Sequence, residues 1–245
     1  MDGRGRVAAS IFVALGLAAG GWLAGRGLVD ARLIDRYVTV KGISEREVRA
    51  DLAIWPIRVV TADNDLAAAQ ARLVENLKKV REFLTAHGVD AAKAELQRLE
   101  VTDANANPYG DANRVRYRYV VRQTLVVRSD KPDAIAEVAQ KAGELVSAGI
   151  VLSSEDEGYG SGGPRYMFTK LNDLKPPMIE EATARARESA AKFAQDSKSK
   201  LGGIRQGSQG VFEILPRDQG PGAQETAQIA KLVRVVTTVE YFLKD

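Results

Sequence analysis

The pattern of hydrophobic and polar positions first shows one long apolar segment near the start of the chain. No charged residue occurs from Val7 to Gly25, the run between Arg6 and Arg26. As a helix rising about 1.5 Å per residue, this run would measure about 28 Å, close to the bilayer hydrocarbon thickness of about 30 Å. The pattern predicts an N-terminal transmembrane helix that contacts membrane lipid through residues 7–25. A cleaved signal peptide and a buried helix of a soluble protein are the alternatives.

Basic residues on both sides of this segment determine its expected orientation. Arg4 and Arg6 precede it and favour a cytoplasmic N-terminus, whereas Arg26 and Arg32 follow it and weaken that preference. We therefore expect a single-pass protein of the inner (cytoplasmic) membrane with its C-terminal domain in the periplasm. Residues 1–35 would form the cytoplasmic stub, the transmembrane anchor and a short linker.

Beyond the anchor, apolar residues recur with a period of two in several blocks, which is typical of half-buried strands. A turn is predicted near Gly42, and Pro56 is expected to mark a strand edge or a bulge. The predicted strands lie at residues 37–40, 48–54, 96–101, 114–128 and 232–243.

Three segments show the spacing of amphipathic helices. Asp63 is expected to cap the first, whose apolar stripe runs to Leu84 and which ends at His87 and Gly88. The second should begin at Ser129 or Asp130 and end at Gly149.

The third helix is predicted to begin near Pro176 or Pro177 and to stop at Gly202 and Gly203. Small residues on one face would let it approach the sheet closely. This face holds Ala182, Ala186 and Ala190, with Phe193 and Leu201 further along.

Strands in runs, with helices as long connections, predict an α+β fold with a mainly antiparallel sheet packed against long helices. Residues 36–245 are expected to form this domain outside the cytoplasm, although their number would also suffice for two small domains.

Composition narrows the function classes. The 245 residues are 45% hydrophobic and 27% charged, as in an ordinary folded protein. The chain has no cysteine, which excludes disulfides, thiolate nucleophiles and cysteine metal sites. A net charge of only +3 argues against a dedicated nucleic-acid binder.

Few residues qualify as catalytic or metal-binding candidates. The only histidine, His87, lies at a predicted helix end and is interpreted as a cap. Glu155, Asp156 and Glu157 lack the spacing of a calcium loop, and the glycines from Gly158 to Gly163 lack the lysine and helix of a phosphate cradle. We therefore predict no catalytic, cofactor-binding or metal-binding residues, and no cofactor.

One strand carries a row of arginines on its polar face, opposite apolar residues such as Val121, Leu125 and Val127. This row is the candidate interaction face. The alternative is a solvated sheet face on which the arginines pair with Glu95, Glu100 or Asp103 of a neighbouring strand. The row consists of Arg114, Arg116, Arg118, Arg122 and Arg128.

Several segments, in this order and spacing, resemble the SIMPL domain family, the YggE-like periplasmic proteins. The alanine-rich helix at 182–195, followed by Leu-Gly-Gly-Ile at 201–204, resembles the family's signature helix and turn. Further matching segments are Val-Thr-Val-Lys-Gly at 38–42, Ala-Asp-Leu-Ala at 50–53, the stretch 166–179 and the terminal strand at 233–243.

The resemblance implies an exported bacterial protein of α+β fold, with large ring-like oligomers in some members and a link to oxidative-stress tolerance in others. No catalytic residues are established for the family. We therefore expect a non-enzymatic, homo-oligomerising interaction module of the cell envelope, with no particular protein partner indicated.

Three alternatives remain from the sequence. The first is a soluble periplasmic oligomer released by signal cleavage. The second is an enzyme handling oxidants through Met167, Met178, Tyr117 or Tyr119. The third is a signalling adaptor with the opposite topology and a cytoplasmic partner.

Overall fold

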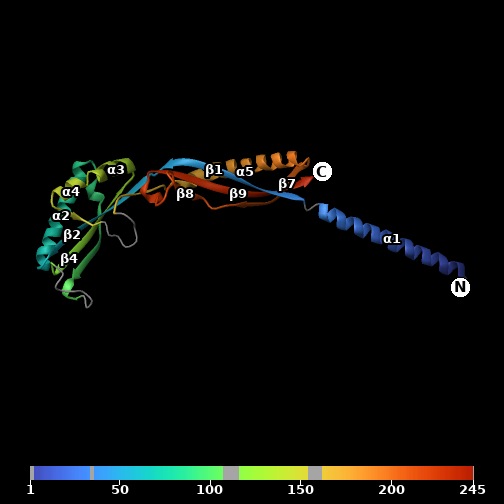
Figure 1. Cartoon of the computed structure of the whole chain (residues 1–245), viewed down its shortest axis with the longest axis horizontal. Helices are drawn as coiled ribbons and strands as arrows, with labels where there is room; N and C mark the ends of the chain where they lie inside the picture. The colour runs from blue at the N-terminus through green and yellow to red at the C-terminus, as the bar shows by residue number, and fades with distance from the viewer. Residues whose placement is uncertain (1–2, 34–35, 107–115, 154–161, 245) are drawn as a thin grey trace. The chain divides into compact units, whose positions relative to one another are not determined.

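The structure is a computed structural model of the chain that describes residues 3–33, 36–106, 116–153 and 162–244. Its helices and strands follow one another in the order shown in Figure 1. Short 3₁₀ helices connect some of them, namely η1 (Ala91–Lys93), η2 (Ala104–Ala106) and η4 (Glu225–Ala227).

Helix α1 (Gly3–Leu33) contains the whole uncharged run predicted to be helical. Its side chains are described for residues 12–27, where all of them are exposed, including Phe12 and Trp22. Over the described residues, no helix has both the length and the apolar character that crossing a membrane requires. The predicted helix is therefore confirmed, and its role as a transmembrane anchor stays a prediction.

The chain divides into two compact units, each described here by itself. Strands β1 (Tyr37–Arg49) and β9 (Ala230–Lys244) contribute residues to both. The first unit comprises Met1–Glu45, Lys175–Glu213 and Arg234–Asp245, and the second comprises Arg46–Leu174 and Ile214–Val233.

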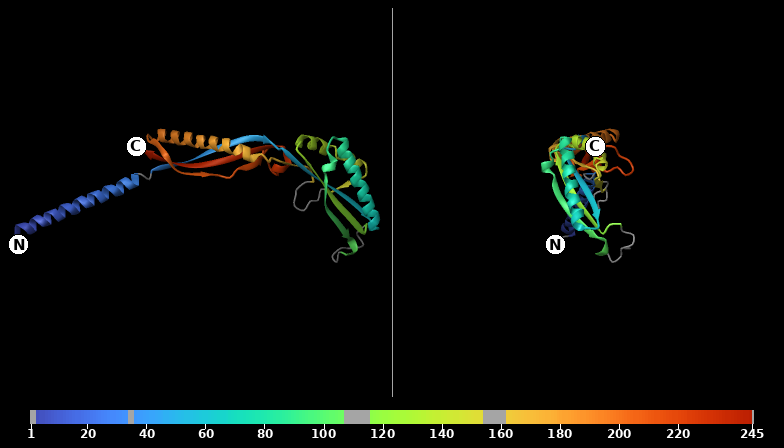
Figure 2. Two further views of the ribbon diagram at one scale, coloured as in Figure 1. Left: turned by 180° about the vertical axis from the view of Figure 1, so that it is seen from behind. Right: turned by 90° about the vertical axis from the view of Figure 1, so that its left-hand side faces the viewer.

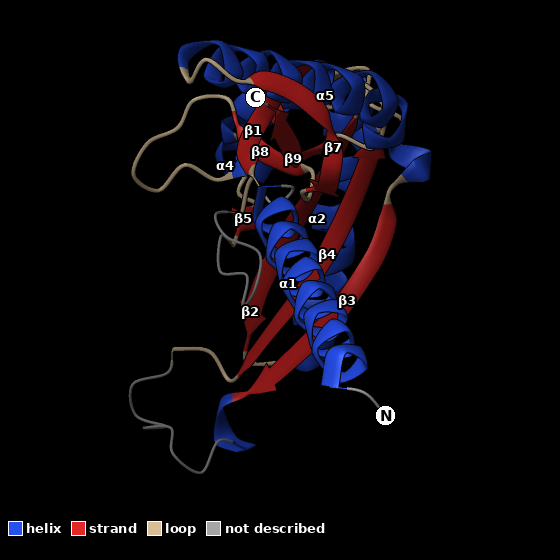
Figure 3. Cartoon of the chain, turned by 90° about the vertical axis from the view of Figure 1, so that its right-hand side faces the viewer, coloured by secondary structure: helices blue, strands red, loops and turns tan. Residues whose placement is uncertain are grey.

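The second unit contains an antiparallel five-stranded sheet in the order β3-β4-β2-β5, with β6 also pairing with β2. The three long strands β2, β3 and β4 are visible as red ribbons in Figure 3. Their bounds are β2 (Leu52–Asp63), β3 (Glu95–Asp103), β4 (Tyr119–Ser129), β5 (Val151–Leu152) and β6 (Arg165–Met167).

Helices α2 (Leu66–Ala86) and α3 (Pro132–Gln140) pack on one face of this sheet. Alternate residues of β2, from Ala53 through Trp55 to Val59, are buried against the apolar stripe of α2. The expected alternation of Val48, Ala50, Leu52 and Ile54 along one strand is wrong, because the chain bends at Ala50 and Asp51 and shifts the buried face by one residue.

Pro56 lies at a gap in strand pairing, as its sequence context predicted. It is opposite Val126 on β4. On the other side of β2, β6 pairs with Leu52–Ile54 and β5 pairs with residues 59–60, so Pro56 falls between the two short strands. A residue without an N–H donor is tolerated there because that edge has no ladder bond to make.

The ends of α2 are fixed by polar groups. Asp65 is the N-cap and accepts hydrogen bonds from the N–H groups of Ala67 and Ala68. Asp63 was the predicted cap, but its carboxylate instead accepts from the N–H groups of Asn64 and Asp65 as β2 ends. At the other end, His87 is the C-cap and Gly88 has a φ of +77°, as predicted.

The single helix predicted between residues 129 and 149 is in fact two, α3 and α4 (Gly143–Ser147). The break falls at Lys141 and Ala142, whose N–H groups bond to carbonyls three residues earlier. Gly143 follows immediately as the first residue of α4. Gly149 ends α4 with a φ of +81°.

The first unit contains a sheet in the order β1-β9-β7. Strand β8 (Glu213–Pro216), which belongs to the second unit from Ile214 onward, also pairs with β9. Strand β7 (Lys200–Gln209), which the sequence pattern did not reveal, runs antiparallel to β9. Helix α5 (Leu171–Asp196) lies along this sheet from Lys175 onward, as Figures 1 and 2 show from opposite sides.

The predicted close approach of α5 is confirmed, because Ala182, Ala186 and Ala190 are fully buried. Strand β1 runs straight through Gly42, so the turn predicted there is wrong. A Cβ at Gly42 would lie 1.8 Å from the carbonyl oxygen of Ala182 and 2.6 Å from the nitrogen of Ala186. This glycine is present because the helix backbone touches the strand.

Helix α5 differs from prediction at both ends. It begins at Leu171, so Pro176 and Pro177 lie inside it, just after the boundary between the two units at Leu174. It ends at Asp196, whereas Gly202 and Gly203 lie in β7. A Cβ at Gly202 would be 2.9 Å from the carbonyl oxygen of Phe242, where the pairing of β7 with β9 is irregular.

Candidate functional site

The predicted arginine row is only partly on a strand. Arg122 and Arg128 lie on β4, with side chains on the face opposite buried Val121, Leu125 and Val127. Arg116 and Arg118 precede the strand, because β4 begins at Tyr119 rather than at Arg114. Arg114 lies outside the described residues.

Two of these arginines form the cross-strand ion pairs that the alternative interpretation proposed. Arg128 binds Glu95 of β3 at 2.7 Å. Arg118 donates to both carboxylate oxygens of Asp103, from Nη2 at 3.2 Å and from Nε at 3.3 Å. The hydrogen bonds from these arginines lower the pKa of both carboxyl groups below their ordinary values.

Arg122 differs from these two arginines because the carboxylate opposite it binds other arginines. Glu100 is its partner in the strand register, but Glu100 pairs with Arg58 of β2 and, at 3.3 Å, with Arg98. Arg122 donates to the hydroxyl of Thr102 at 3.2 Å, and it has no carboxylate partner among the described residues. The polar sheet face therefore carries positive charge that its own carboxylates do not neutralise.

The remaining arginine, Arg116, is exposed and lies over the ring of Tyr117, with its guanidinium carbon 5.7 Å from the ring centre. The row's function as an interaction face stays a prediction. Arg116 and Arg122 are the described members without an ion pair.

His87 has the capping role that its position predicted. Its backbone N–H bonds to the last carbonyls of α2, and its Nδ1 lies 2.9 Å from the carbonyl oxygen of Phe83. Its Nε2 is 3.6 Å from a carboxylate oxygen of Glu144 on α4. The ring thus connects the end of α2 to α4.

A buried lysine is likewise structural. Lys231 on β9 is fully buried and donates to the carbonyl oxygen of Glu225 at 2.7 Å, and it also pairs with the Glu225 carboxylate. A buried charge requires such a partner. The pair fixes η4 against the start of β9.

Other sequence candidates form no site within the part of the chain that the structure describes. Glu155, Asp156, Glu157, Gly158 and Gly160 lie outside the described residues. Across the described ranges, no group of three or more histidine, aspartate or glutamate side chains is arranged to hold a metal ion. The methionines considered for oxidant chemistry differ in access, because Met178 is fully buried and Met167 is exposed.

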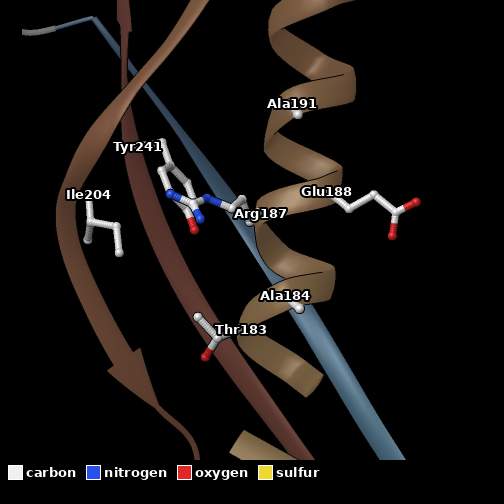
Figure 4. A pocket seen from close by; sticks show the side chains of 7 residues that line it. All are labelled: Thr183, Ala184, Arg187, Glu188, Ala191, Ile204 and Tyr241. Atoms are coloured by element: carbon white, nitrogen blue, oxygen red, sulfur yellow. The ribbon is translucent and has the colours of Figure 1, made fainter. Parts of the chain in front are cut away.

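A groove of about 490 Å³ in the first unit was not anticipated from the sequence. It lies between α5 and the strands β7 and β9, and Figure 4 shows the side chains around it. Helix α5 covers β1 and β9 through its alanines, and it leaves Ile204 of β7 57% exposed beside it. The side chains that line the groove include Thr183, Ala184, Arg187, Ala191, Ile204 and Tyr241.

The groove combines apolar walls with few polar groups, as small-molecule sites commonly do. Figure 4 shows Arg187 extending from α5 toward Tyr241, while Glu188 points away from them. No local motif could have found this site, because its residues come from three elements distant in sequence. The only signal was the alanine stripe, which indicated how α5 faces the sheet.

Comparisons with known proteins give one firm assignment. No curated protein matches the chain. One similar solved structure is described as the crystal structure of an uncharacterized conserved protein from Listeria innocua. It is 11% identical, with a TM-score of 0.19, and the match covers 78% of this chain and 91% of that chain.

The family model named SIMPL, described as a protein of unknown function (DUF541), matches residues 38–240. This match spans both compact units and well over half of the chain. The chain belongs to the SIMPL family.

Proposed function

We propose that this chain is a membrane-anchored SIMPL-domain protein whose domain acts in the periplasm as a non-enzymatic, oligomerising interaction module of the cell envelope. The uncharged run Val7–Gly25 within α1 supports the anchor. Exposed apolar side chains such as Phe12, Leu17 and Trp22 are costly in water, and lipid would cover them.

The observation that carries the interaction role is the surplus positive charge on the second unit's sheet. The helices pack on the opposite face, and Arg122 has no carboxylate partner in the described part of the chain. Arginine is well suited to bind a carboxylate through two parallel hydrogen bonds. An acidic surface of another protein, or of a further copy of this chain, would supply that carboxylate.

The test is native mass measurement of the full chain solubilised in detergent. We expect one defined oligomer larger than the 26.5 kDa monomer. Replacing Arg116, Arg118 and Arg122 together by glutamine should shift the mass toward the monomer. The matched control replaces three exposed arginines elsewhere in the second unit that already have acidic partners, Arg49, Arg72 and Arg217.

A monomeric native chain, or an arginine-row variant with unchanged mass, would contradict the oligomerisation proposal. Measuring a chain that begins at Arg32 in parallel would separate self-association of the domain from association through α1.

Because the family resemblance implies a link to oxidative-stress tolerance in some members, we extend the proposal to a protective role without catalytic turnover. The exposed Met167 would react once with an oxidant and be spent, whereas Met178 is protected by burial. We expect the purified chain to consume hydrogen peroxide only up to its content of 3 methionines. Sustained consumption beyond that amount would identify an enzyme instead.

A further inference from the structure

Arg187, the cation of the groove between α5 and β7, has no polar partner in the described part of the chain. Among the described residues, Arg187 makes neither an ion pair nor a hydrogen bond. Three other arginines of the first unit each have a carboxylate partner, unlike Arg187. Arg185 binds Glu181 at 2.7 Å, Arg205 binds Glu240 at 3.2 Å and Arg234 binds Glu45 at 3.3 Å.

A buried phenol also lines the groove. Tyr241 is only 1% exposed. Its hydroxyl makes no hydrogen bond within the described structure. Tyr241 lines the groove, so the little surface that it exposes lies there. Buried tyrosines usually direct this group to a partner.

A third donor and the apolar walls complete the site. The hydroxyl of Thr183 likewise has no protein partner among the described residues and lies on the same groove. Ala184, Ala191 and Ile204 supply apolar surface next to these donors. The acidic neighbour, Glu188, points away from the guanidinium in Figure 4, so it does not neutralise the groove.

We propose that this groove binds small organic monocarboxylates that have an apolar body. The carboxylate would accept hydrogen bonds from Arg187, Thr183 and Tyr241, and the body would lie against Ile204 and the alanines. A guanidinium presents a planar fork that matches a carboxylate, and one cation balances one negative charge. A volume of about 490 Å³ is within the range of small-molecule sites.

This inference is independent of the proposed anchor and of the arginine row. The groove lies entirely within the first unit, whereas the arginine row lies in the second. Loss of oligomerisation would therefore leave ligand binding unchanged.

The experiment is calorimetric titration of the full chain in detergent with phenylacetate, after subtraction of a detergent-only blank. Phenylacetamide serves as the neutral ligand of the same shape. Arg187→Gln and Tyr241→Phe remove the two proposed contacts. Arg185→Gln is the matched control, because this arginine lies on the same helix but is paired with Glu181. Thermal unfolding verifies that each variant is folded.

Phenylacetate should bind in a saturable manner, and phenylacetamide should bind at least about tenfold more weakly, because a hydrogen bond to a charged group is lost. Arg187→Gln should weaken phenylacetate binding by about tenfold or more, Tyr241→Phe by about fivefold, and Arg185→Gln by less than about twofold.

Absence of saturable binding, equal affinity for acid and amide, or unchanged binding by Arg187→Gln would each overturn the proposal. Inorganic phosphate binding more tightly than phenylacetate would also overturn it, since the apolar walls would then play no part. The acid–amide comparison needs no variant, so it decides the question even if a substitution disturbs folding.

Discussion

The two compact units are stabilised in opposite ways. In the second, large side chains of α2 such as Leu73 and Leu84 are buried against Trp55 and Ile57 of the sheet. In the first, α5 presents small alanines to the strands, and its backbone touches Gly42. Stability in the second unit therefore depends on the apolar area that is buried. In the first unit it depends on a close approach of α5 to the strands, which leaves no room for added atoms.

The largest loss of stability should come from adding one methyl group to the first unit. Gly42→Ala places a Cβ 1.8 Å from the carbonyl oxygen of Ala182, so α5 must separate from β1. We expect a loss of about 4 kcal/mol or more in unfolding free energy, measured by chemical denaturation of the full chain. Hydrogen exchange should locate the loss in β1 and α5.

Gly203→Ala is the control, because a Cβ there would meet nothing within 4 Å. Similar destabilisation by both substitutions would show that glycine flexibility, rather than close approach, matters in this unit.

Removing atoms from the second unit should have a somewhat smaller effect. Leu73 is fully buried in the core under α2. Leu73→Ala should lower the unfolding free energy by about 3 kcal/mol through lost burial and a residual cavity. Val74→Ala on the exposed side of the same helix should change it by less than about 0.5 kcal/mol. An equal effect of both would contradict the assigned helix face.

The cap of α2 should contribute less than its core residues. Asp65→Ala removes the acceptor for the N–H groups of Ala67 and Ala68 and should cost about 1 kcal/mol in thermal or chemical unfolding. Asp63 is the residue that the sequence predicted to be the cap. Hydrogen exchange at the first turn of α2 should increase less in Asp63→Ala than in Asp65→Ala. A larger increase in Asp63→Ala would show that Asp63 is the cap.

The smallest expected effect is pH-dependent and belongs to the second unit's polar face. The hydrogen bond from Arg128 lowers the pKa of the Glu95 carboxyl below its ordinary value of 4.5. A lowered pKa means that the pair stabilises the fold above that value and that this contribution is lost as the pH falls through the folded-state pKa.

Arg128→Gln should therefore be slightly less stable than the native chain at neutral pH, and the difference should vanish in acid below the folded-state pKa. Urea denaturation at a series of pH values measures it. Arg187→Gln, at an arginine without an ion pair among the described residues, should show no such pH dependence. A difference that persists in acid would mean that Arg128 acts through packing.

Patterns local to the sequence predicted most elements of this fold. The apolar stripe of α2, the alternation of β9 and the alanine face of α5 each depend on residues close together in the chain. Several of the errors concern glycine and proline. Gly42 and Gly202 resemble a turn and a helix end, but each allows close contact with a distant backbone. No local pattern reveals such a contact.

The candidate sites show the same limit. The pairing of Arg128 with Glu95 could be predicted from two neighbouring strands. The pairing of Glu100 with Arg58 could not, because it depends on β2 and β3 lying on either side of β4. The groove could not be predicted because Arg187, Ile204 and Tyr241 meet only in the folded first unit. Strand β7 was missed because its many glycines and polar residues lack an apolar alternation.

Protease accessibility tests the central claim, an anchored chain with its domain outside the cytoplasm, most directly. Cells producing the full chain are converted to spheroplasts, treated with protease and separated by high-speed sedimentation. The account predicts that the intact chain sediments with membranes and that external protease degrades the domain. Full-length chain in the soluble cytosolic fraction, resistant to protease until the cells are lysed, would contradict it.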